Sequence, residues 1–140
     1  MEVHTSRKGG YRTVPTAPHG DLLDAQCPTR WLLDRLGGKW VSMIIKLLGD
    51  SSAEMRFSHL QQHMPGVTHK MLSQTLKQLV ADGLVERRVE DSVPPAVHYR
   101  LTPLGDSLST PLAALRNWAE SHMHEIDTIH ANRCAAEHAE

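Results

Sequence analysis

The segment from Arg56 to Gly105 is the feature that most limits how this 140-residue chain can fold. It contains a short helical stretch, the turn Pro65-Gly66, a longer amphipathic stretch and then two β-prone runs. Proline ends a helix and glycine allows the chain to reverse, so we expect the two helical stretches to cross each other. This order predicts a winged helix-turn-helix, in a fold that is mainly α with a small β-wing.

The stretch after the turn carries the clearest helical period, beginning at a Thr68 cap and ending at Gly83. At about 100° per residue, one apolar stripe is formed by Leu72, Leu76, Leu79 and Val80. Lys70, Gln74 and Lys77 fall together on the opposite side of the helix. We therefore expect a buried leucine stripe and an exposed polar face.

The shorter stretch before the turn is expected to begin at Ser58, with Gln61 completing a capping box. Its inward side chains are expected to be Phe57, Leu60 and Met64. Between residues 55 and 81 the chain contains one arginine and two lysines and no acidic residue. This composition favours an approach to phosphate.

Residues 84–89 and 97–101 are β-prone, and Asp91 to Pro95 lie between them. Proline is excluded from central strands, so the two runs predict a two-stranded wing with an exposed tip. Acidic residues at the tip would repel phosphate. Contacts of the wing with a nucleic acid backbone are therefore expected from Arg87, Arg88, His98 or Arg100.

Further helices flank this unit. Pro28 starts one that ends at Gly37-Gly38, and the next, over residues 40–48, is apolar nearly all round and is expected to be the core. After the wing, Thr102-Pro103 restarts a helix that should continue to Ile126, with a kink at Pro111.

A helix of that length cannot bury its apolar stripe on so small a domain, so we expect it to pack on a second subunit. Large aromatic residues often anchor interfaces, although each tryptophan can equally belong to the core of its own chain. The predicted dimer interface consists of Trp31, Leu108, Leu112, Leu115, Trp118 and Met123.

The formal net charge of −1 hides an uneven distribution. Residues 30–100 hold ten Lys or Arg against seven Asp or Glu, whereas residues 101–140 hold two against six. The middle of the chain is therefore expected to face phosphate and the acidic end to face away. No apolar run is long enough for a bilayer and no secretory signal opens the chain, which predicts a cytoplasmic protein without a membrane partner.

The domain organisation is expected to be a flexible arm at 1–22, one domain at 23–126 and a polar tail at 127–140. The chain has no glycine-rich phosphate loop and no nucleophile elbow, so neither an enzyme nor a cofactor is predicted. His59 and His63 have the i, i+4 spacing of metal ligands, but zinc needs three or four ligands, and no metal site is predicted. A metal-responsive regulator and a winged-helix protein-interaction module without DNA binding remain alternatives.

Four segments together resemble the HxlR-type winged helix-turn-helix regulators, a bacterial and archaeal transcription factor family related to the MarR group. The segments, which span residues 27–119, are CPTRWLLDRLGGKW, RFSHLQQHMPGVTHKMLSQTLKQLVADGLVER, VPPAVHYRLTPLG and LAALRNWA. The resemblance implies a homodimer that binds double-stranded operator DNA, with repression the commoner outcome. Together with the parts above, it predicts DNA contacts from Lys39, Arg56, Thr68, His69, Lys70, Ser73, Gln74, Lys77, Arg87 and Arg88.

Cys27 occupies a position where many members of the resembling family carry a cysteine, and several of these respond to electrophiles or oxidants. A thiol at a helix start can be acidified by the helix dipole, and the thiolate is the reactive form. Redox sensing through Cys27, with an electrophile or oxidant as a small-molecule partner, is therefore one hypothesis. A small packed residue is the other. Cys134 is either a free thiol or a resolving partner.

Overall fold

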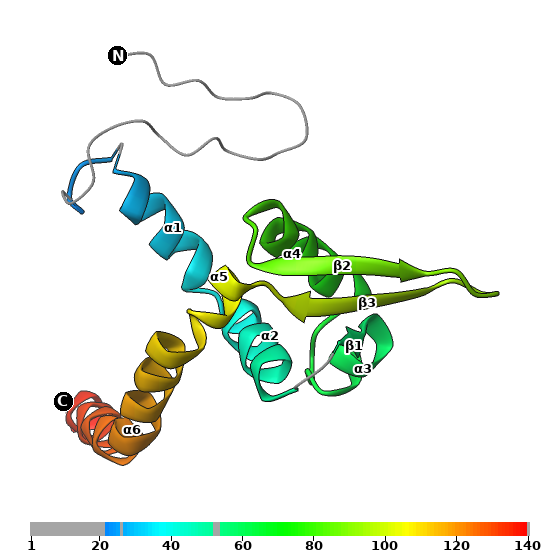
Figure 1. Cartoon of the computed structure of the whole chain (residues 1–140). Helices are drawn as coiled ribbons and strands as arrows, with labels where there is room; N and C mark the ends of the chain where they lie inside the picture. The colour runs from blue at the N-terminus through cyan, green and yellow to red at the C-terminus, as the bar shows by residue number, and fades with distance from the viewer. Residues whose placement is uncertain (1–21, 26, 52–53, 140) are drawn as a thin grey trace.

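The computed structural model describes residues 22–25, 27–51 and 54–139, which form a helical domain with one small sheet (Figure 1). The elements follow the order α1 (Pro28–Leu36), α2 (Lys39–Asp50), β1 (Met55–Arg56), α3 (Phe57–Gln62), α4 (His69–Ala81), β2 (Val85–Glu90), β3 (Ala96–Leu101), α5 (Pro103–Asp106) and α6 (Ser109–His138). The predicted fold class, mainly α with a β-wing, is confirmed. The predicted arm, 1–22, lies outside the described residues except for Leu22.

The core lies where α2 and α4 meet the sheet. As predicted, α2 is central, and it buries Val41, Ile44, Ile45 and Leu48. The predicted stripe of α4 is also confirmed, because Leu72, Leu76 and Leu79 are fully buried, with Val80 partly buried beside them. Burial of these branched side chains supplies most of the driving force that holds α4 in place.

The sheet has three antiparallel strands in the order β1-β3-β2. The two longer strands are the predicted wing, and Arg88 of β2 lies opposite His98 of β3. The short strand β1 was not predicted, because two residues carry no alternating pattern. Its pairing depends on the tertiary position of β3, where Met55 lies opposite Tyr99 and Arg56 opposite His98.

The structure corrects the predicted start of α3. This helix begins at Phe57, and its N-cap residue, Arg56, makes no side-chain capping hydrogen bond, so the predicted capping box of Ser58 and Gln61 is wrong. The reason is that Arg56 belongs to β1 and the helix starts as soon as the strand ends. The inward positions of Leu60 and Met64 are confirmed.

The helix predicted from Thr102 to Ile126 is divided in two. Thr102 caps α5 as predicted, since its Oγ1 accepts a hydrogen bond from the Gly105 amide at 3.0 Å. The helical hydrogen-bond pattern is then interrupted at Ser107 and Leu108, although both residues keep right-handed helical dihedral angles. Pro111 has no N–H to donate to the Ser107 carbonyl, and its ring would clash there, so the interruption lies one turn before the proline.

Gly105 fixes α5 against the base of the wing. It is buried, and a Cβ atom at this position would overlap the carbonyl oxygen of Leu84. The Thr102 hydroxyl also donates to the carbonyl of Gly83 at 2.6 Å. Together these contacts join the end of β3 to the turn that precedes β2.

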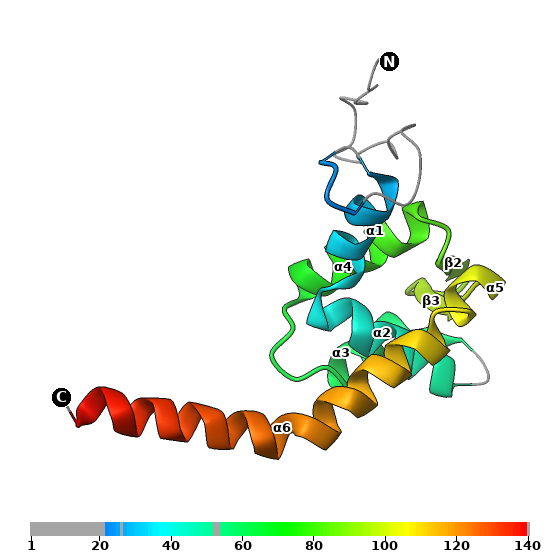
Figure 2. The same ribbon diagram turned by 90° about the vertical axis from the view of Figure 1, so that its left-hand side faces the viewer.

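The last helix, α6, leaves the domain as a long arm (Figure 2). Its first turns pack on α2, but none of its 30 residues is buried. The helix continues to His138, so most of the segment predicted as a tail, 127–140, is helical. Within the described ranges, no helix combines the length and apolar character needed to cross a membrane.

Candidate nucleic-acid interface

Helix α4, the second helix of the predicted helix-turn-helix and here called the recognition helix, has one polar face uncovered. Its N-terminus is closed by Thr68, whose Oγ1 accepts a hydrogen bond from the Met71 amide at 3.1 Å. The buried leucine stripe then turns the opposite face to solvent. Lys70, Gln74 and Lys77 are exposed, and no other described residue engages their side chains. This face is free to donate hydrogen bonds to a ligand outside the chain.

A hollow of about 680 Å³ lies between the start of α4 and the wing. His69 and Ser73 of α4 and Arg87 of β2 line it, together with Ser58 and the wing tip from Ser92 to Val97. None of its lining residues is acidic. The imidazole of His69 packs on Phe57, with ring centroids 4.6 Å apart. The structure therefore brings four predicted DNA-binding residues to one hollow suited to an anion, namely Arg56, His69, Ser73 and Arg87.

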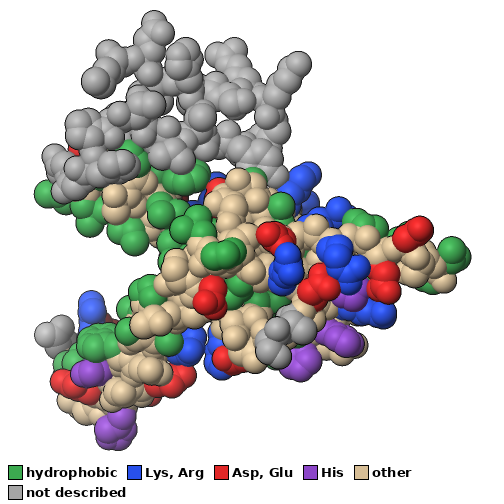
Figure 3. Space-filling model, viewed as in Figure 1, with side chains coloured by type: hydrophobic (Ala, Val, Ile, Leu, Met, Phe, Trp, Pro, Cys, Tyr) green, Lys and Arg blue, Asp and Glu red, His purple; other side chains and the backbone are tan. Residues whose placement is uncertain are grey.

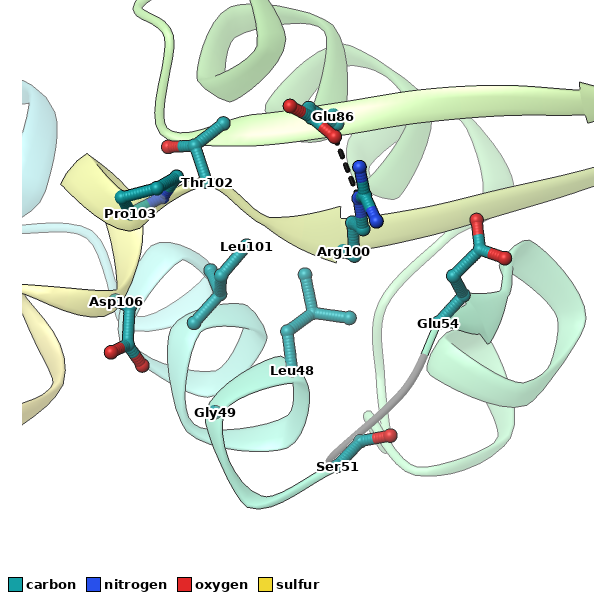
Figure 4. A pocket seen from close by; sticks show the side chains of 10 residues that line it. All are labelled: Leu48, Gly49, Ser51, Glu54, Glu86, Arg100, Leu101, Thr102, Pro103 and Asp106. Atoms are coloured by element: carbon teal, nitrogen blue, oxygen red, sulfur yellow. Dashed lines mark hydrogen bonds and ion pairs between the residues drawn. The ribbon is translucent and has the colours of Figure 1, made fainter.

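The outer face of the sheet carries the other cations of the wing, and there they are paired with acids (Figure 3). Arg88 Nε donates to both carboxylate oxygens of Glu54, at 3.0 and 2.8 Å. Arg100 Nε donates to Glu86 at 2.6 Å, at the edge of a second hollow shown in Figure 4. Alternation along β2 places Arg88 on the face opposite to Arg87.

Glu90 contacts two further basic side chains on the outer face. His98 Nε2 lies 2.8 Å from its carboxylate, and Arg56 Nη2 lies 3.9 Å from the same oxygen. The hydrogen bond with His98 lowers the pKa of Glu90, just as the hydrogen bond from Arg88 lowers the pKa of Glu54. Arg56 borders the hollow beside α4 with part of its length, but its guanidinium is directed to Glu90.

These acidic partners were not among the residues predicted from the sequence. Glu86, Arg88 and Glu90 alternate along one strand and His98 and Arg100 along the other, which is the pattern of cross-strand ion pairs. To recognise these pairs, one must know which residue of β2 lies opposite which residue of β3. That register depends on the length of the wing loop, and the sequence does not define this length. Of the predicted wing contacts, only Arg87 is placed beside the recognition helix.

Lys39 lies at a different edge of the domain. It is the first residue of α2 and is exposed, with its Nζ 4.6 Å from the centre of the Trp40 ring. That ring reaches towards Gly66 in the turn between α3 and α4. Lys39 is therefore placed beside the turn and not in the hollow that contains Arg87.

The predicted interface residues separate into two groups. Leu108 and Leu112 pack against the core of their own chain. Leu115, Trp118 and Met123 lie further along α6 and are exposed, with 65%, 56% and 45% of their surfaces accessible. Trp31 of α1 is half-buried and has the Arg35 guanidinium 5.1 Å from its ring centre.

The two thiols differ in environment. Cys27 is buried at the N-cap position of α1, whereas Cys134 is exposed on α6, and they are not bonded to each other. In the described part of the chain no three His, Cys, Asp or Glu side chains come together as metal ligands. His63 of the predicted histidine pair has its Nδ1 2.7 Å from the backbone oxygen of His59.

Known proteins are similar to this chain in both sequence and architecture. Residues 35–127 match the family model of the HxlR-like helix-turn-helix. The uncharacterized HTH-type transcriptional regulator YtfH of Escherichia coli (strain K12) is 38% identical over 116 residues, which is 83% of this chain and 90% of YtfH.

Two solved structures show the same arrangement. The transcriptional regulator ytfH from Salmonella typhimurium superposes with a TM-score of 0.74 at 38% identity, over 81% of this chain and 99% of that one. The redox regulator HypR in its reduced form gives a TM-score of 0.65 at 34% identity, over 72% and 98%. This chain therefore belongs to the HxlR-like helix-turn-helix family and is a DNA-binding transcriptional regulator, not an enzyme.

Proposed function

We propose that the protein binds operator DNA as a homodimer, with α4 of each subunit in a major groove, and that it represses transcription. The observation that carries this proposal is the uncovered polar face of α4, which is continuous with an acid-free hollow under the wing. Repression follows where the operator overlaps a promoter, because the bound dimer covers DNA that the polymerase needs. A target on the chromosome would place the protein in the cytoplasm.

The chemistry of α4 supports direct reading of bases. The 13-residue helix is about 20 Å long at 1.5 Å per residue, which is enough to cross a major groove. Gln74 can pair with adenine through two hydrogen bonds, and Lys70 or Lys77 can pair with guanine. Each such contact is worth about 1–3 kcal/mol of discrimination between bases. Thr68, His69, Ser73 and Arg87 are then placed for the adjoining backbone.

The test is a selection of bound sequences from a random DNA pool. We expect Gln74→Ala to broaden the selected motif, because it removes a base contact. We expect Lys39→Ala to preserve the motif and to weaken all sites alike, because Lys39 lies beside the turn and is suited to a phosphate. Asn132→Ala, on the arm far from α4, is the matched control. If the wild-type protein selected no motif and bound random DNA poorly at low salt, an interaction module would replace this proposal.

The apolar surface of the flanking helices supports dimerisation. Leu115, Trp118 and Met123 on α6 are exposed, and Leu32 and Leu33 of α1 add to the same kind of surface. Exposed apolar surface of this extent favours association with another protein surface. We expect sedimentation to show a dimer at micromolar concentration and a monomer for Leu115→Glu. A wild-type monomer under these conditions would remove the dimer from the proposal.

We also propose that Cys27 makes binding responsive to oxidants. Support comes from its place at the N-terminus of α1, where the helix dipole favours a thiolate, and from the similarity to the redox regulator HypR. Because Cys27 is buried, oxidants should react with it slowly unless α1 moves. Diamide should release DNA from wild type and from Cys134→Ser but not from Cys27→Ser. An unchanged response in Cys27→Ser would exclude this role.

A further inference from the structure

One ion pair joins the recognition helix to α1. Arg35 lies in the last turn of α1, and Asp82 is the C-cap residue of α4. Arg35 Nη1 is 3.4 Å from Asp82 Oδ2, and the two side chains are only 14% and 12% exposed. The pair therefore connects two helices to which the proposed function gives different tasks, contact between subunits for α1 and contact with DNA for α4.

This ion pair is not explained by a contribution to stability. Neither Arg35 Nη1 nor Asp82 Oδ2 has a hydrogen-bond partner of good geometry in the described chain. Burial raises the pKa of Asp82, and the nearby charge of Arg35 opposes that rise only in part. Desolvated pairs with few hydrogen bonds are often no more stabilising than apolar side chains of the same size. Separating the two charges, however, would leave each one buried without a partner, so the pair resists any movement of one helix away from the other.

Neighbouring contacts extend the connection in both directions. On one side, the Arg35 guanidinium lies 5.1 Å from the ring centre of Trp31, a residue of the expected subunit interface. On the other side, the Asp82 amide donates to the Gln78 carbonyl at 3.0 Å, which fixes Asp82 to the last turn of α4. The chain Trp31–Arg35–Asp82 thus leads from α1 directly to the end of the recognition helix.

We propose that the Arg35–Asp82 pair is a positioning element that sets the angle of α4 relative to α1, and with it the distance between the two recognition helices of the dimer. This inference rests on the proposed dimeric binding of two half-sites. Two recognition helices read half-sites at a fixed spacing only if each is held rigidly to the elements that join the subunits. A movement of α1 would therefore change the position of α4 on the DNA through the Arg35–Asp82 pair.

The test measures affinity by fluorescence anisotropy on duplexes whose two half-sites are separated in steps of one base pair. Wild type should bind best at one spacing. Asp82→Asn, which keeps the shape of the side chain, and Arg35→Gln should each lose about tenfold at that spacing, within the usual range of coupling between sites. Both should show a flatter dependence on spacing and unchanged affinity for a single half-site. Lys46→Gln, which removes the exposed ion pair with Asp50 at 2.7 Å, is the matched control and should behave as wild type.

The charge-reversed double variant Arg35→Asp with Asp82→Arg separates positioning from simple loss of stability. It should recover a sharp spacing optimum, because it restores the attraction across the same contact. The inference is wrong if the single variants keep the wild-type spacing profile, or if the double variant folds, as judged by circular dichroism, and still has a flat profile. Failure of the wild-type protein to bind any duplex would instead overturn the proposed function itself.

Discussion

Removing Arg87 should weaken DNA binding in a way that depends on salt, whereas removing Arg88 should not. Arg87 lines the acid-free hollow beside α4, and no other described residue engages its side chain. Arg88 lies on the opposite face of the wing, where Glu54 accepts both of its hydrogen bonds. Only Arg87 is therefore available to neutralise a phosphate and release a counterion.

The size of the effect follows from the number of contacts. Each phosphate contact adds about 0.9 to the slope of log affinity against log salt concentration. A dimer that loses Arg87 from both subunits should therefore have a slope shallower by about 1.8. When the salt concentration rises from about 50 to 200 mM, the fold-loss of affinity should therefore be about twelve times smaller for Arg87→Ala than for wild type.

The assay is fluorescence anisotropy with one operator duplex at four or more salt concentrations. Arg88→Ala is the matched variant, since it removes the same charge from the neighbouring residue of the same strand. Glu54→Gln is a second check, because it frees Arg88 from its partner without turning it towards α4, and the slope should stay unchanged. A slope that decreased equally for Arg87→Ala and Arg88→Ala would refute the assignment of the two faces of the wing.

Three further outcomes are expected for stability. Thr68→Ala should lower the free energy of unfolding by about 1 kcal/mol in urea, because it removes the cap of α4, while Thr128→Ala on the exposed arm should change it little. Leu76→Ala should cost about 2–5 kcal/mol, because this side chain is fully buried in the core; a smaller loss would mean that the core closes around the cavity. The pKa values of Glu54 and Glu90 are lowered by their partners, so stability should be complete above the ordinary glutamate value of 4.5 and fall as acid protonates these groups below it. Unfolding followed from pH 7 to about pH 3 should show a weaker fall for Glu54→Gln with Glu90→Gln than for wild type.

The parts of the fold that were predicted correctly are those specified by local sequence. The leucine spacing and the Thr68 cap define α4, and the prolines between the strands mark the wing tip. The strand β1 and the start of α3 were missed or misplaced because the pairing of Arg56 opposite His98 is a long-range event. A capping box is a local signal, and here the tertiary pairing prevails over it.

The candidate site was predictable in its residues but not in its geometry. The polar face of α4 follows directly from periodicity, and so the exposure of Lys70, Gln74 and Lys77 could be predicted. Alternation along the strand places Arg87 and Arg88 on opposite faces of the sheet. It could not predict which of the two faces α4, because the buried face of the sheet was not known from the sequence. The Arg35–Asp82 contact joins residues far apart in sequence, and nothing in the local pattern indicates it.

The glycine at position 105 has a mechanical consequence for the arm. The backbone of Gly105 packs directly on the Leu84 carbonyl, just before β2. Helix α5 therefore cannot slide or tilt unless the start of β2 moves with it. The direction in which α6 departs therefore depends on how α5 rests on the sheet, since only two residues separate the two helices. Even Gly105→Ala would push α5 away from Leu84 and change the direction of α6, a helix of 30 residues.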